Sequence, residues 1–183
     1  MPISEATYTL VALEQPSWLW ELDRGNLRSR PGMSVEHNHV QGTLAYRLML
    51  QLDRHAYQVR PNLGRLRTAT RSYYVPDLYV LPSELARRKL REAPRQLEVY
   101  DEPMPLVAEV WSPDVCDYDV EVKLSAYRQR GDLEIWRIHP NERTLTAWRR
   151  QPDGSYSETL NERGAVRPVA LPNVTIELER LFE

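Results

Sequence analysis

The chain of 183 residues is 42% hydrophobic and 27% charged, with a formal net charge of −2. This composition excludes a disordered chain, and the length predicts one domain over residues 1–183. The single cysteine excludes an internal disulfide, and there is no signal-like start and no uninterrupted apolar run of about 18 residues. We therefore expect a cytoplasmic protein that does not contact a membrane.

Charge is unevenly distributed along the chain. Residues 60–95 contain nine basic and three acidic residues, whereas residues 96–123 contain eight acids and one base. This suits a cation-binding pocket beside a phosphate-attracting surface, although two oppositely charged solvated faces explain it equally well. Lys89 and Lys123 are the only lysines beside 22 arginines, and lysine, unlike arginine, is a compact charge that can give up a proton.

The first third of the chain predicts two helices and a hairpin. A capping serine begins a helix over residues 4–14, and a turn at residues 23–26 joins the strands of a hairpin over residues 18–30. Residues 34–54 predict the next helix because apolar residues recur every four positions, at Val40, Leu44, Leu48 and Leu52.

The rest of the chain predicts a sheet with a helix between two of its strands. The expected strands cover residues 56–60, 63–69, 75–81, 105–111, 133–138, 144–149 and 156–160. Residues 82–95 are expected to be helical or irregular, and residues 117–130 form a helix that ends at Gly131. This order favours an α/β protein with a mixed sheet.

Two acidic residues stand where buried strands would place apolar ones. Glu109 lies between Ala108 and Val110, and Asp77 precedes an apolar run. Burying an unpaired carboxylate costs several kcal/mol, so something must compensate it. Acids on neighbouring strands could converge as hard oxygen ligands for Mg²⁺ or Mn²⁺. Alternatively, Glu109 pairs with an arginine and Asp77 caps a turn.

The helix over residues 117–130 carries a polar stripe that could point at the same place. Asp119, Lys123 and Tyr127 are spaced four apart, so they share one helix face. The alternative is a surface ion pair between Asp119 and Lys123, worth about 0.3 kcal/mol, with Tyr127 as a packing residue.

Together these residues resemble the PD-(D/E)XK nuclease signature. Pro76-Asp77 is followed by Glu109-Val110-Trp111, where Trp111 stands at the position that normally holds a lysine. By alternation along the strand, we expect Trp111 to share the side of Glu109 and to pack over the site.

The surrounding segments resemble the Uma-type restriction endonuclease family in particular. In that family the strand ends Glu-Val-x-Ser-Pro, as at residues 109–113. It is followed by Asp-x-x-x-Lys-x-x-x-Tyr, as at 119–127, and by Gly-x-x-Glu-x-Trp, as at 131–136. Residues 20–25 resemble the family's opening hairpin, and Met33, Ser34 and His37 resemble the start of its first core helix. The resemblance covers essentially the whole chain.

The resemblance implies a fold and a set of roles. The fold is a restriction-endonuclease-like αβββαβ core, with a mixed central sheet flanked by helices, an N-terminal helix and β-hairpin, and C-terminal antiparallel strands. Asp77, Glu109 and the carbonyl of Val110 would hold Mg²⁺ or Mn²⁺, and Lys123 would supply the lysine from the helix. The accessory candidates are Glu21, His37, Asp119 and Tyr127.

The implied activity is metal-dependent hydrolysis of DNA phosphodiester bonds by an endonuclease, with a homodimer left open. The main alternative is a catalytically weak or inactive nuclease-fold domain that binds nucleic acid or a protein partner. Hydrolysis of another phosphate ester is a third reading, because metal, carboxylates and lysine do not define the leaving group. The near-neutral net charge argues against strong general DNA affinity.

Overall fold

The computed structural model describes residues 2–30, 32–112 and 117–183, and for residues 117–120 it describes the backbone alone. Its largest sheet has six strands in the order β11-β10-β9-β8-β6-β3. These strands are β3 (Tyr57–Pro61), β6 (Leu78–Pro82), β8 (Leu106–Val110), β9 (Glu134–His139), β10 (Thr144–Arg150) and β11 (Tyr156–Asn161). Only β8 and β9 pair in parallel within this sheet, so it is mixed, as expected.

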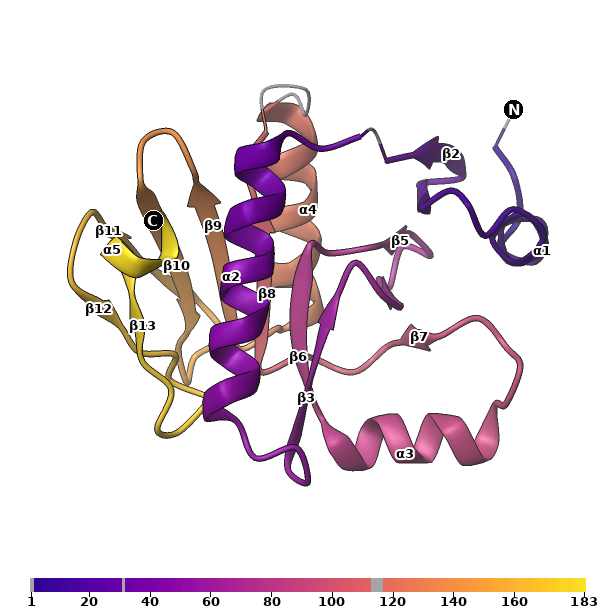
Figure 1. The fold of residues 1–183 in the computed structure, drawn as a ribbon. Helices are drawn as coiled ribbons and strands as arrows, with labels where there is room; N and C mark the ends of the chain where they lie inside the picture. The colour runs from indigo at the N-terminus through magenta and orange to yellow at the C-terminus, as the bar shows by residue number, and fades with distance from the viewer. Residues whose placement is uncertain (1, 31, 113–116) are drawn as a thin grey trace.

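Helices α2 (Val35–Gln51) and α4 (Asp117–Arg130) cover the two faces of the main sheet. Figure 1 shows α2 on one side of β8 and β9, with α4 on the other. The long connection through α4 is needed because β8 and β9 run parallel. The chain order α2, β3, β6, β8, α4, β9 confirms the predicted αβββαβ core.

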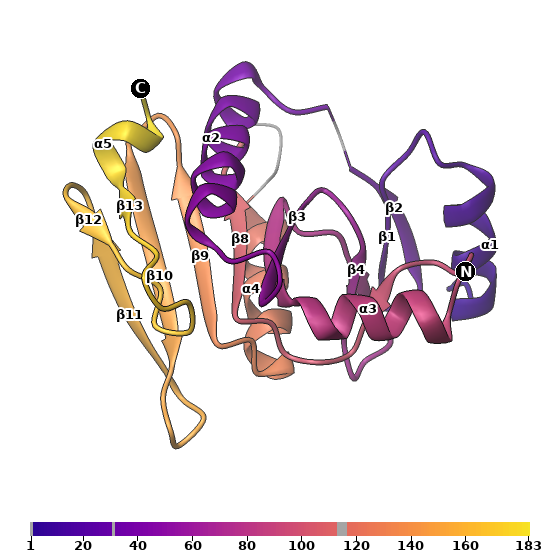
Figure 2. The same ribbon diagram turned by 60° about the horizontal axis from the view of Figure 1, so that its bottom comes forward.

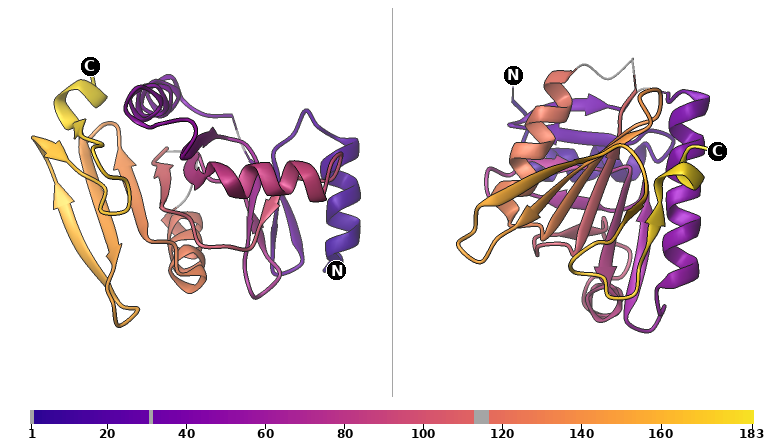
Figure 3. Two further views of the ribbon diagram at one scale, coloured as in Figure 1. Left: turned by 90° about the horizontal axis from the view of Figure 1, so that it is seen from below. Right: turned by 90° about the vertical axis from the view of Figure 1, so that its left-hand side faces the viewer.

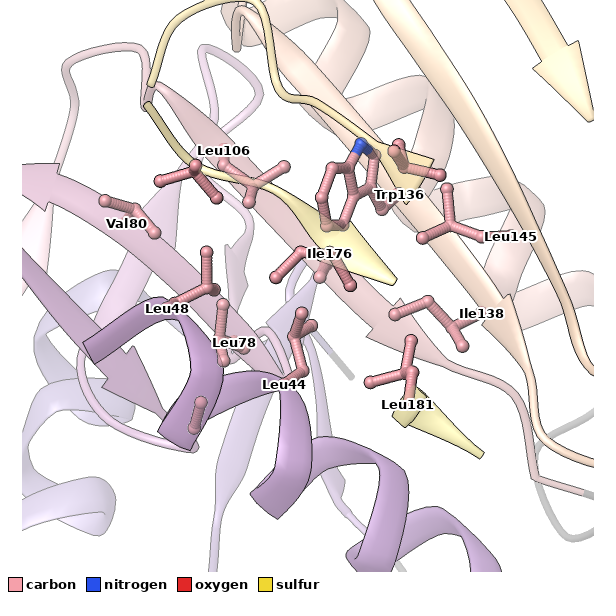
Figure 4. Packing of buried hydrophobic residues seen from close by; sticks show 14 of the residues in the cluster. Leu44, Leu48, Leu78, Val80, Leu106, Trp136, Ile138, Leu145, Ile176 and Leu181 are labelled. Atoms are coloured by element: carbon pink, nitrogen blue, oxygen red, sulfur yellow. The ribbon is translucent and has the colours of Figure 1, made fainter. Parts of the chain in front are cut away.

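Strand alternation divides the sheet's side chains between two hydrophobic cores. Leu78, Val80 and Leu106 face α2, where they pack around Leu44 and Leu48 (Figure 4). The intervening residues face α4; Tyr79, Val107 and Ile135 pack with Leu124 and Tyr127. The period of two along each strand thus supplies an apolar layer to both helices.

A second sheet lies beside the first and was not predicted as a unit. Its strand order is β2-β1-β5-β4-β7, so the N-terminal hairpin is extended by three short strands. The strands are β1 (Trp20–Asp23), β2 (Asn26–Ser29), β4 (Arg65–Arg67), β5 (Tyr73–Tyr74) and β7 (Val99–Tyr100). Helix α1 (Glu5–Glu14) packs on it through Tyr8 and Ala12. Figure 2 shows this part at the opposite end of the molecule from the C-terminal strands.

The C-terminal segment closes the core on the α2 side. Strands β12 (Ala165–Val166) and β13 (Ile176–Glu177) pair, and the short helix α5 (Leu178–Leu181) follows. Ile176 and Leu181 are buried in the α2 core, and both panels of Figure 3 show this segment beside β10 and α2. Helix α3 (Ser83–Glu92) makes residues 82–95 mainly helical. Over the described residues, no helix is long and apolar enough to cross a membrane.

Local signals set the ends of the two main helices. Ser34 caps α2, because its side chain accepts a hydrogen bond from the backbone N–H of His37 at 3.2 Å. Gly131 follows α4 with a φ of +79°, a conformation that glycine adopts without strain. Both ends agree with the sequence prediction.

Replacing Leu44 by alanine tests the packing of α2. Leu44 is fully buried, so Leu44→Ala should lower the free energy of unfolding by about 3 kcal/mol through lost burial and a residual cavity. Urea unfolding measures this as a lower midpoint with an unchanged slope. Leu50→Ala, at a 65% exposed position of the same helix, is the control and should cost less than about 0.5 kcal/mol. Equal losses in both variants would contradict the assignment of the buried face.

Candidate active site

Asp77 and Glu109 meet where β6 and β8 lie side by side. Leu78 pairs with Ala108, so Asp77, just before β6, lies opposite Glu109. The Asp77 backbone N–H donates to Glu109 Oε2 at 3.4 Å. Asp77 is 1% exposed, and the Glu109 side chain is 12% exposed. The two carboxylates thus share one buried location.

The Asp77 carboxylate is enclosed by positive and donor groups. Arg30, at the end of the N-terminal hairpin, donates from Nη2 to Oδ1. His37 Nε2, in the first turn of α2, lies 3.1 Å from Oδ2, which also accepts from the Val110 backbone N–H at 2.7 Å. The side chain of Arg30 is 8% exposed, so this ion pair is shielded from water.

Lys123 and Tyr127 of α4 reach the Glu109 carboxylate. Tyr127 donates its hydroxyl to Glu109 Oε1 at 2.6 Å, and Lys123 Nζ lies 3.5 Å from the same oxygen. Lys123 Nζ also lies 2.8 Å from Glu21 Oε1, which accepts from the Val75 backbone N–H at 2.8 Å. Because Lys123 is buried between two carboxylates, it is not the surface ion-pair partner of the alternative reading.

The two carboxyl groups have opposite pKa shifts. Burial disfavours the Asp77 anion, but the charge of Arg30, the hydrogen bond from His37 and the charge of Lys123 outweigh this effect and hold the pKa of Asp77 well below its usual range. Burial raises the pKa of Glu109 to about 7, with Lys123 opposing and Asp77 reinforcing the shift. Burial also acts to lower the pKa of Lys123, yet Glu109 and Glu21 keep it raised.

Arg30, Gln41 and Asn62 belong to the site although sequence reasoning missed them. Arg30 Nη1 donates to Asn62 Oδ1 at 2.9 Å, and Asn62 Nδ2 donates to Gln41 Oε1 at 3.1 Å. Gln41 Nε2 in turn donates to the Asp77 carbonyl at 2.5 Å. One signal for Gln41 existed, since it lies one turn after His37 on the buried face of α2. No local pattern distinguishes Arg30 or Asn62 from surface residues.

Two of the residues that the sequence singled out, Asp119 and Trp111, are not among the contacts of this cluster described above. The side chain of Asp119 falls outside the described residues. The Trp111 ring stacks on His139, with ring centroids 4.2 Å apart and an interplanar angle of 18°. Whether this ring also packs over the carboxylates stays a prediction.

The basic segment over residues 60–95 places much of its charge away from the carboxylates. Strand β6 runs from Asp77 to the start of α3, so this helix begins at the far end of the strand. Its arginines are also paired: Arg87 and Arg91 with Glu84, at 3.2 and 2.9 Å, and Arg88 with Glu92 at 3.8 Å and with Glu102. Helix α3 therefore offers less free positive charge than its sequence suggests.

A mixed sheet between two helices, with carboxylates on adjacent strands and a lysine on the crossover helix, defines a nuclease-like fold. The fold is similar to that in the "Crystal structure of a putative nuclease belonging to DUF820 from Anabaena variabilis". The TM-score is 0.73 at 18% sequence identity, and the match covers 89% of each chain. Residues 6–179 match the Uma2 family, described as "Putative restriction endonuclease", so the chain belongs to this family. No curated protein matches it.

Replacing Arg30 tests whether its guanidinium compensates the buried negative charge of Asp77. Arg30→Met leaves Asp77 as a buried carboxylate without its main cation, so the free energy of unfolding at pH 7 should fall by about 3–5 kcal/mol. The lowered pKa of Asp77 stabilises the fold fully above the unfolded-state value near pH 4, and this stabilisation is lost progressively as the pH falls from there towards the lowered folded-state pKa. The difference between wild type and variant should therefore shrink below about pH 4.

The matched control for this prediction is Arg91→Met. The Arg91 side chain is 61% exposed and pairs with Glu84 on the surface of α3, so its loss should change stability by less than about 0.5 kcal/mol. Urea unfolding between about pH 2 and pH 8 measures both variants. A loss for Arg30→Met that stays constant over this range would contradict the ion-pair explanation.

Proposed function

We propose that this chain is a metal-dependent endonuclease that hydrolyses DNA phosphodiester bonds. The observation that carries the proposal is the meeting of Asp77, Glu109 and Lys123 in one buried cluster. Two carboxylates and a lysine are the groups that such hydrolysis uses to hold a cation and to offset negative charge. Membership of the Uma2 family supports the same class of reaction.

The residues that would hold Mg²⁺ or Mn²⁺ are Asp77, Glu109 and the carbonyl of Val110. One or two carboxylates suffice for Mg²⁺, which keeps several waters. The described residues contain no group of three or more histidine, cysteine, aspartate or glutamate side chains arranged for a metal ion, so two carboxylates and one carbonyl would be the protein's whole contribution. A bound cation would lower the pKa of a water and polarise the phosphate.

The protein's own groups would orient the carboxylates and the lysine and would neutralise charge on the phosphate. Tyr127 holds Glu109 by a 2.6 Å hydrogen bond, and Glu21 holds the Lys123 ammonium at 2.8 Å. From that position Lys123 would offset the negative charge that develops on the phosphate in the transition state. His37 and the Val110 backbone N–H orient the second oxygen of Asp77.

The alternative is a nuclease-fold domain that binds nucleic acid or a protein partner without cleaving. The contact between Arg30 and Asp77 favours it, because the guanidinium already neutralises the carboxylate that a cation would use. Under our proposal Asp77 would help to hold a cation in place of its pairing with Arg30.

Cleavage assays separate these two functions. Purified protein should nick or cut supercoiled, linear or single-stranded DNA when Mg²⁺ or Mn²⁺ is present and not in EDTA. Glu109→Ala should abolish cleavage and metal binding together. DNA binding that weakens with salt, without cleavage under either metal, would favour the binding-domain alternative.

Exchanging the two lysines for arginine tests the role of Lys123. Lys123→Arg keeps the charge, but the broad guanidinium does not fit a space shaped for an ammonium between Glu21 and Glu109. We expect cleavage to fall at least about 100-fold at saturating metal. Overpacking of the buried site should also lower the free energy of unfolding by about 1–3 kcal/mol.

The control is Lys89→Arg on α3, where the ammonium lies 5.9 Å from the Tyr100 ring centroid. Arginine makes the same kind of contact with an aromatic face, so cleavage and stability should be unchanged. Wild-type cleavage by Lys123→Arg would refute the catalytic assignment and leave Lys123 as a buried structural cation.

A further inference from the structure

A second feature lies on the same face of the main sheet as Glu109. It is a hollow of about 500 Å³ whose lining includes Trp111, Arg137, His139, Thr146, Glu142 and Glu158. We call it the Trp111 hollow. None of these residues belongs to the carboxylate cluster, and the roles proposed above do not use them.

Strand register connects the Trp111 hollow directly to the carboxylates. Glu109 on β8 pairs with Arg137 on β9, and Arg137 pairs with Thr146 on β10. These three residues form one row across the sheet, and paired residues face the same side. Adjacent strands are about 4.8 Å apart, so the backbone of Thr146 lies about 10 Å from that of Glu109.

An aromatic platform forms one side of the hollow. The Trp111 and His139 rings stack at 4.2 Å, and His139 Nδ1 accepts a hydrogen bond from the Glu142 backbone N–H at 3.1 Å. The histidine ring is therefore held in place, and both rings line the hollow. Flat aromatic rings of this kind stack with nucleobases.

The charges around the hollow disfavour a phosphate. Glu142 and Glu158 both line it, and Arg137 is already paired with Glu121 of α4 at 3.3 Å. A flat and uncharged ligand therefore fits better than an anion, since like charges repel. Threonine hydroxyls at the floor, including that of Thr146, can donate or accept hydrogen bonds.

We propose that the Trp111 hollow binds one unstacked nucleobase of the substrate strand, next to the phosphate that a cation at Asp77 and Glu109 would polarise. The inference rests on the proposed function for the identity of the ligand. It predicts a preference for single-stranded or locally opened DNA, because taking a base out of a duplex costs free energy that an already unpaired base does not.

The test uses two short probes and no divalent metal. One is a fluorescein-labelled abasic backbone of about 11 nucleotides, a length within the range of roughly 4–16 nucleotides that single-strand-binding sites cover, with a single central thymine. The other lacks that base. Fluorescence anisotropy in EDTA measures binding without cleavage. For the wild-type protein the thymine should strengthen binding about tenfold, in line with base–aromatic stacking.

Variants assign that gain to Trp111. In Trp111→Ala the thymine should give no gain, whereas Trp111→Phe should keep most of it because an aromatic face remains. Trp18→Ala, at a 55% exposed position in the N-terminal region, is the matched control and should behave as wild type. If Trp111→Ala fails to fold, as judged by circular dichroism, the Trp111→Phe and wild-type comparisons still apply.

The outcomes separate this inference from the proposed function. A tenfold gain that persists in Trp111→Ala, or no gain in wild type, overturns the base-binding role whether or not the protein cleaves DNA. A gain that depends on Trp111 supports it, even if the cleavage assays show that the chain is a binding domain.

Discussion

The rest of the site depends on the compensation of two buried carboxylates by buried cations. An isolated carboxylate in a protein interior costs several kcal/mol, so Asp77 and Glu109 are tolerable only with partners in place. Those partners come from different parts of the chain: Arg30 follows the N-terminal hairpin, and Lys123 lies on α4. The second sheet, the main sheet and α4 must therefore come together for either acid to be buried.

This arrangement shifts the pKa values of the two carboxyl groups, Asp77 and Glu109, in opposite directions. Asp77 is surrounded by donors and cations, so its anion is strongly favoured. Glu109 is desolvated beside that anion, and its pKa rises to about 7 in spite of Lys123. A divalent cation shared by the two groups would favour the ionised form of both. A site that is held by Arg30 in one state and by a cation in the other is consistent with the proposed function.

The position of Lys123 shows how the same charge can reach a site from another element. Trp111 stands two residues after Glu109, and its ring stacks on His139. The ammonium that reaches Glu109 comes instead from α4, which packs on the same face of the sheet. In this way β8 can contribute an acid to the cluster and an aromatic ring to the neighbouring hollow.

The sequence alone determined the elements of the core and most residues of the candidate site. Apolar periodicity predicted α2 and the strands, and acids at otherwise apolar positions singled out Asp77 and Glu109. Lys123 was singled out by its four-residue spacing on one helix face with Asp119 and Tyr127 and by the scarcity of lysine. These are local patterns, and local backbone geometry is enough to interpret them. Only the tertiary structure decided which residues and strands of the chain contact one another. It paired Asp77 with an arginine, placed Glu21 against Lys123, and joined the hairpin to three distant strands. Such contacts link segments far apart in the chain, so they depend on how the two sheets pack and leave no periodic signal in the sequence.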